Sequence, residues 1–204
     1  QFLAALLKAD LGVRYNSVPI TNSGKSWERG SLFVLKGDNL KKDSYLEKLE
    51  IIATQFGRTL HPITTGYSSA GPDLGAAEVH LIKPPKVAIL RTDQASTLSY
   101  GEIWHYFEQQ LEYPLMQVDE SRLESALETM DQLILPNGYY GKWSNNDLND
   151  KIMEWVRKGG KIIALAGALD HFANTEAFKL KKKEGPETDT TLVPYEELER
   201  TEIS

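Results

Sequence analysis

The stretch that decides the fold is "KIIALAGALDHF", residues 161–172. Its first part is a continuous apolar run, which is typical of a strand covered on both faces of a parallel sheet. The small residues Ala166, Gly167 and Ala168 follow and predict a tight turn that leads toward a helix. In many α/β enzymes such an elbow presents a nucleophilic Ser or Cys. This elbow carries neither, so the sequence predicts the shape of an active site without the attacking atom.

The chain before this stretch alternates strands with helices. Apolar runs predict further strands, at 86–90, 114–119 and 131–138. Helical spacing predicts helices between them, at 100–111, 120–130 and 145–160. This alternation indicates parallel βαβ units with right-handed crossovers. We therefore expect an α/β fold with a doubly wound, mostly parallel, flavodoxin-like sheet.

A smaller unit is expected at the N-terminus. Its sequence predicts a helix over 1–10, strands within 13–20, 31–37 and 78–82, and a helix over 45–57. A long Gly- and Pro-containing connection and the pair Pro84-Pro85 then suggest a boundary. We expect a small α/β linker subdomain at 1–84 and the main domain at 85–204.

Composition narrows the possible functions. The 204 residues carry a formal net charge of −6, and 41% of them are hydrophobic. An acidic chain disfavours general nucleic-acid binding, and no apolar run approaches the ~20 residues of a membrane span. There are no cysteines, which excludes disulfides, thiolate zinc sites and cysteine nucleophiles. The chain starts without Met and ends in a charged, helix-like stretch, so a fragment truncated at its C-terminus is expected.

Function in doubly wound folds sits at the carboxyl ends of the strands. Three loops are expected there, at 91–99, 137–143 and 166–171. They supply the candidate crevice residues, which are Asp93, Asn137, Gly138, Tyr139, Gly167 and His171. The chain contains no GxGxxG or Walker pattern, so nucleotide binding by those routes is unsupported.

Each candidate also has a commoner structural role. An Asp after a strand, such as Asp93, is more often a helix cap or a loop anchor than a ligand. Gly138 can take a positive φ and aim backbone N–H groups into the crevice, as an oxyanion site requires. However, "PNG" is simply a good turn, which is the favoured interpretation. His171 has no Ser or Cys nearby in sequence to activate.

No metal site is expected. The pair His105 and Glu108 has the H-x-x-E spacing of some zinc peptidases, but a catalytic zinc needs three protein ligands. The pair lies in a helix whose buried stripe is expected at Ile103, Trp104 and Phe107. The acids Glu120, Glu124 and Glu128 recur every four residues and predict a solvated helix face, and the basic run 179–185 is short.

The order and spacing of these segments resemble a known family. The segments "KVAILRTD", "DQLILPNGYY" and "IMEWVRKGGKIIALAGAL" resemble the class I glutamine-amidotransferase-like domain behind the peptidase domain of certain bacterial secreted zinc carboxypeptidases. Upstream, "GSLFVLKGDN" is similar to the segment that joins the two domains. The resemblance extends from about Leu11 to Phe172.

What the resemblance implies for this chain is limited. In true class I amidotransferases the elbow holds a Cys, and the matching position here falls at Ala166 or Gly167. Their His–Glu pair would lie beyond Ser204, and the peptidase zinc ligands would lie before Gln1. The resemblance therefore implies a non-catalytic accessory domain without a cofactor of its own, in a secreted or periplasmic protein. Its implied partners are the zinc-bearing peptidase domain of the same chain and a peptide or glycan.

Two other functions stay open. A flavodoxin-like small-molecule-binding or hydrolytic domain would use Asp93, Asn137, Tyr139 and His171 around one pocket. A purely structural interaction module would instead show a large exposed apolar patch.

Overall fold

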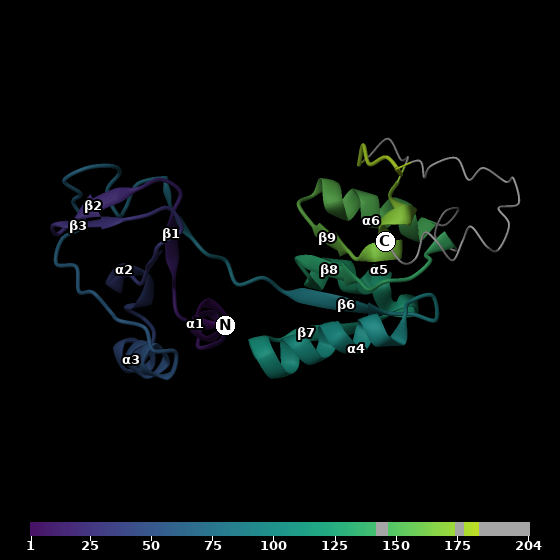
Figure 1. The fold of residues 1–204 in the computed structure, drawn as a ribbon, viewed down its shortest axis with the longest axis horizontal. Helices are drawn as coiled ribbons and strands as arrows, with labels where there is room; N and C mark the ends of the chain where they lie inside the picture. The colour runs from purple at the N-terminus through teal and green to yellow at the C-terminus, as the bar shows by residue number, and fades with distance from the viewer. Residues whose placement is uncertain (142–146, 174–177, 184–204) are drawn as a thin grey trace, which may run out of the picture.

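The computed structural model describes residues 1–141, 147–173 and 178–183. Figure 1 shows two units joined by an extended segment that leads into β6. The helix-like stretch expected near the C-terminus lies outside the described residues, as do the last two residues of the predicted crevice loop 137–143 and the start of the predicted helix 145–160. No helix among the described residues is long and apolar enough to cross a membrane.

The N-terminal unit is a small antiparallel arrangement. Its helices are α1 (Phe2–Lys8), α2 (Lys36–Asn39) and α3 (Tyr45–Gln55). Its strands are β1 (Arg14–Asn16), β2 (Ile20–Asn22), β3 (Lys25–Trp27), β4 (Leu32–Phe33) and β5 (Val79–Leu81). The sheet order is β4-β1-β5, beside a β2-β3 hairpin. The single strand expected within 13–20 is thus two short strands, because the chain leaves β1 before Pro19, which has no backbone N–H to donate.

Two polar anchors hold this unit together. Arg14 donates from Nε and Nη2 to the two carboxylate oxygens of Asp38, at 2.7 and 2.9 Å. This bond to the guanidinium lowers the pKa of Asp38. The fully buried Asn39 accepts from Gly12 N at 2.7 Å and donates to Gly12 O at 3.0 Å. These contacts tie α2 to the chain between α1 and β1.

The main unit contains a parallel sheet of four strands. They are β6 (Val87–Arg91), β7 (Leu115–Asp119), β8 (Gln132–Leu135) and β9 (Lys161–Ala164). Their order is β7-β6-β8-β9, and every pair is parallel. The expected doubly wound, flavodoxin-like α/β sheet is therefore confirmed.

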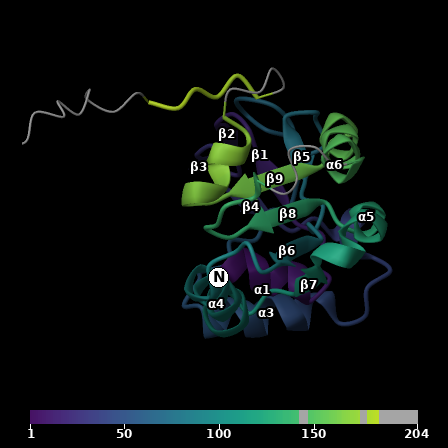
Figure 2. The same cartoon turned by 90° about the vertical axis from the view of Figure 1, so that its right-hand side faces the viewer.

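Helices cover both faces of this sheet. The helix α4 (Thr97–His105) lies on one face, and α5 (Leu123–Ala126) and α6 (Asp147–Arg157) lie on the other (Figures 1 and 2). The side chains of β6 alternate accordingly. Val87 and Ile89 pack toward α4, whereas Ala88 and Leu90 pack toward α5 and α6. This two-sided burial explains why the strand is apolar at four successive positions.

Two predicted helices differ from the expectation. The helix expected over 100–111 is α4 followed by a π-helical segment, Tyr106–Leu111. Its inner stripe includes Ile103 and Phe107, but Trp104 is 40% exposed, so Trp104 was wrongly placed in the stripe.

The helix expected over 120–130 is broken into 3₁₀ turns, Glu120–Arg122 and Leu127–Thr129, on either side of α5. The hydroxyls of Ser125 and Thr129 donate to the carbonyls three residues earlier, at 2.9 and 2.8 Å. Side-chain bonds of this kind compete with regular helix geometry.

Candidate functional site at the carboxyl ends of the strands

The strand order reverses at β6, whose neighbours are β7 on one side and β8 on the other. The loops after β6 and β8 therefore flank the place where doubly wound folds usually bind ligands. In this protein the two loops are bonded to each other. Ser96 N donates to Asn137 O at 2.7 Å, and Tyr139 N donates to Gln94 O at 3.1 Å. These two backbone hydrogen bonds hold the loops together.

Asn137 connects three loops. Its backbone N–H donates to Ser99 Oγ at 3.0 Å, at the start of α4. Its side-chain Oδ1 accepts from Gly167 N at 2.9 Å, in the elbow after β9. Together with the Ser96 bond, these contacts join the loops after β6, β8 and β9 through one residue.

Gly138 is needed for a different reason from the one predicted. Its φ is not in the left-handed region, so Gly138 lacks the backbone conformation that the less favoured oxyanion alternative required. A Cβ at this position would lie 2.3 Å from Gln94 O and 2.9 Å from Ala95 Cα. Only glycine lets the two loops approach this closely at position 138.

The elbow after β9 has unusual backbone geometry. Ala166 has φ +47°, a left-handed conformation that side chains with a Cβ rarely adopt. A 3₁₀ helix, Ala166–His171, follows directly in place of an α-helix. The strained residue has only a methyl group, and the next backbone N–H, that of Gly167, is bonded to Asn137. The elbow thus has neither a nucleophile nor an unoccupied donor at Gly167.

The expectation that Glu120 belongs to a solvated helix face is wrong, because Glu120 is half-buried behind the crevice. Glu120, which follows β7, accepts from the hydroxyl of Thr92 and, at 3.3 Å, from Gln94 Nε2. Tyr140 is 1% exposed and donates to Pro136 O at 2.9 Å. Burial, with a smaller contribution from Glu120, raises the pKa of Tyr140 to about 12. The signal for Glu120 was its place directly after a strand, the same signal that selected Asp93.

The remaining candidates are spread around the rim. Asp93 is exposed and accepts from Thr92 Oγ1 at 3.3 Å. Tyr139 is 78% exposed, whereas its neighbour Tyr140 is buried. The structure therefore places Asn137, Gly138 and Gly167 together, with Asp93 and Tyr139 at the surface.

His171 packs toward α6. Its Nε2 lies 3.3 Å from Asn149 Oδ1, and its ring contacts Phe172 edge to face. Burial lowers the pKa of His171, which favours the neutral imidazole.

An ion pair lies at the outer edge of the same rim. Arg91 and Asp119 are register partners at the ends of β6 and β7, and Arg91 Nε lies 2.6 Å from Asp119 Oδ1. The bond raises the pKa of Arg91 and lowers that of Asp119. Both side chains are well exposed, so the pair contributes little to stability.

Within the described residues, no three His, Asp or Glu side chains gather as a metal site would require. His105 and Glu108 are exposed and lie where α4 gives way to the π-helical segment. Comparisons of the chain with family models, curated proteins and solved structures found no match.

Proposed function

We propose that this chain is a non-catalytic accessory domain of a zinc carboxypeptidase-like protein, built on a class I glutamine-amidotransferase-like fold. The bond from Gly167 N to Asn137 Oδ1 carries the proposal. It occupies the backbone donor of an elbow whose strained residue, Ala166, has no attacking atom.

Hydrolysis at such an elbow requires two things. A nucleophile must reach the substrate carbonyl, and unoccupied donors must stabilise the developing oxyanion. Ala166 cannot supply the first, and the Gly167 N–H cannot supply the second while Asn137 holds it. The close contact of Gly138 with Gln94 O also holds the two crevice loops against each other. These features favour a binding or docking role over a reaction.

Exposed apolar side chains around the crevice support docking. Leu98 is 79% exposed at the start of α4, Tyr139 is 78% exposed after β8, and Leu169 is 45% exposed after β9. The loops that carry them are those joined through Asn137. Exposed apolar groups gathered on one side of a domain favour a contact surface. The proposed occupant is the peptidase domain, or the peptide or glycan that it processes, and zinc belongs to that domain.

The non-catalytic part of the proposal is tested by assaying the purified chain for hydrolysis of glutamine and of short peptides, with and without a chelator. We expect no turnover by the wild type or by Asn137→Ala. Metal-independent hydrolysis by the wild-type chain would contradict the proposal. Ala166→Cys serves as the control for the elbow, because a thiol there can be probed directly with an alkylating reagent.

A further inference from the structure

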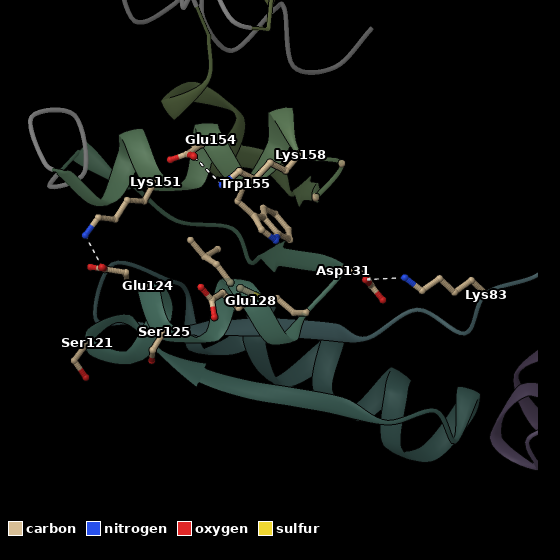
Figure 3. Close-up of a pocket in the computed structure, with 14 residues that line it drawn as sticks. Lys83, Ser121, Glu124, Ser125, Glu128, Asp131, Lys151, Glu154, Trp155 and Lys158 are labelled. Carbon is tan, nitrogen blue, oxygen red and sulfur yellow. Dashed lines mark hydrogen bonds and ion pairs between the residues drawn. The ribbon is translucent and has the colours of Figure 1, made fainter.

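A second surface lies away from the crevice, between α5 and α6. It is an open groove of about 930 Å³ that also reaches Lys83 and Asp131 (Figure 3). Its lining combines an apolar floor with charged walls. Leu127 and Met130, at 6% and 4% exposure, form part of the floor beside the half-buried Trp155. The groove is independent of the proposed function, because none of the crevice residues contributes to it.

The groove has one more acidic side chain than it has basic side chains to pair with. Its three lysines each already have a carboxylate partner. The pairs are Lys151 with Glu124, Lys158 with Glu154 at 2.7 Å, and Lys83 with Asp131 at 3.8 Å. The fourth acid is Glu128, which is exposed and has no ion pair within the part of the chain that the structure describes. The charge that a ligand can neutralise in this groove is therefore negative.

Trp155 offers an apolar surface beside this carboxylate. A Cβ on Gly160 would lie 2.2 Å from Trp155 Cδ2, so the glycine backbone packs directly against the indole and fixes its position. Trp155 and Glu128 come from opposite walls of the groove, α6 and the turn after α5 (Figure 3). Lys158 is held by Glu154, and Glu128 only adds a weaker, longer-range increase to the pKa of Lys158.

We propose that this groove binds an arginine side chain of a protein segment. The aliphatic stem of arginine would cover Leu127 and Met130, and its guanidinium would lie against Trp155 and pair with Glu128. Arginine suits this combination better than lysine, because its planar cation stacks on aromatic rings and bonds a carboxylate with two N–H groups. The surrounding ion pairs would favour neutral flanking residues in the bound segment.

The test is a titration of the isotope-labelled chain with the blocked peptide acetyl-Gly-Arg-Gly-amide, followed by amide and indole NMR shifts. We expect shifts at the Trp155 indole N–H, Glu128, Gly159 and Gly160. The Glu128→Gln variant should bind about two- to fivefold more weakly, since Glu128 is exposed and loses its charge-assisted bond to the arginine. The matched control Glu47→Gln removes an exposed acid from α3 in the other unit and should leave the affinity unchanged.

The same peptide with citrulline in place of arginine should lose affinity by a similar factor, because citrulline keeps the shape without the charge. Equal binding of the citrulline peptide, or unchanged binding by Glu128→Gln, would overturn the proposal. Tighter binding of free L-arginine than of the blocked peptide would overturn the assignment to a protein segment.

Discussion

Asn137 Oδ1 accepts the backbone N–H of Gly167 at 2.9 Å, across 30 positions of sequence. One residue after β8 thereby holds the elbow after β9. While this bond is formed, the Gly167 N–H is not available to a reacting carbonyl oxygen. This single bond is the observation on which the proposed non-catalytic role of the elbow rests.

The first prediction concerns this bond. Replacing Asn137 with Ala removes the acceptor, and we expect a loss of about 1 kcal/mol in the free energy of unfolding. Hydrogen exchange at the Gly167 amide should accelerate about fivefold, in line with that loss. Asn137→Asp keeps an acceptor oxygen at the same place and is the matched control. Unchanged exchange in Asn137→Ala would show that the bond is not formed in solution.

The second prediction concerns the contact between the crevice loops. Gly138→Ala places a Cβ against Gln94 O and should destabilise the protein by about 1–3 kcal/mol, because backbone cannot yield cheaply. Gly101→Ala in α4 meets no atom within 4 Å, and alanine should stabilise this helix by about 0.8–1 kcal/mol. Denaturant unfolding of both variants provides the comparison. Equal stability of the two would contradict the observed loop contact.

The third prediction concerns the strained elbow. Ala166→Gly relieves the left-handed strain and should stabilise the protein by about 0.5–1 kcal/mol, after the entropy cost of glycine is subtracted. The fully buried Ala168 lies two residues later with an ordinary φ, so Ala168→Gly should cost about 1 kcal/mol. In thermal unfolding, Ala166→Gly should raise the midpoint temperature and Ala168→Gly should lower it. Destabilisation by both substitutions would indicate that Ala166 is not left-handed.

The fourth prediction concerns pH. Burial lowers the pKa of His171, so at mildly acidic pH the unfolded chain binds more protons than the folded one. The contribution of neutral His171 to the free energy of unfolding should be fully present above the ordinary histidine pKa of about 6.5. It should be lost as the pH falls toward the lower pKa that His171 has in the folded state. Denaturant unfolding at several pH values measures this slope. His171→Gln should flatten this slope, whereas the control His105→Gln, at an exposed position, should leave it unchanged. A slope in His171→Gln equal to that of the wild type would contradict the assignment to His171.

Much of the main fold could be predicted from the sequence, because most of its strands contain short apolar runs. The runs that became β6 and β8 are buried on both faces, as such runs predict. The run that became β9 was expected to be covered in the same way, but β9 lies at the edge of the sheet and its Ile163 is 42% exposed. Such patterns are local, so they need no knowledge of distant residues. The helix α3 could also be predicted from local signals. Its apolar residues have helical spacing, and Gly57, with φ +59°, follows its end.

The details of the site could not be predicted, since they depend on contacts between distant segments. The need for glycine at position 138 arises from Gln94, 44 positions earlier, and not from its own turn. Glu124 and Glu128 share the expected spacing, but Glu124 pairs with Lys151 of α6, which only the packed structure reveals. The left-handed backbone of Ala166 could not be predicted, because alanine rarely adopts that conformation.

The most direct test of the account is the intact mass and zinc content of the native gene product purified from its host. The account predicts a zinc-bearing polypeptide much larger than the 22.9 kDa of this chain, with peptidase activity located outside residues 1–204. A metal-free product of about that mass would contradict it, and the crevice and groove would then have to be explained as sites of an independent protein.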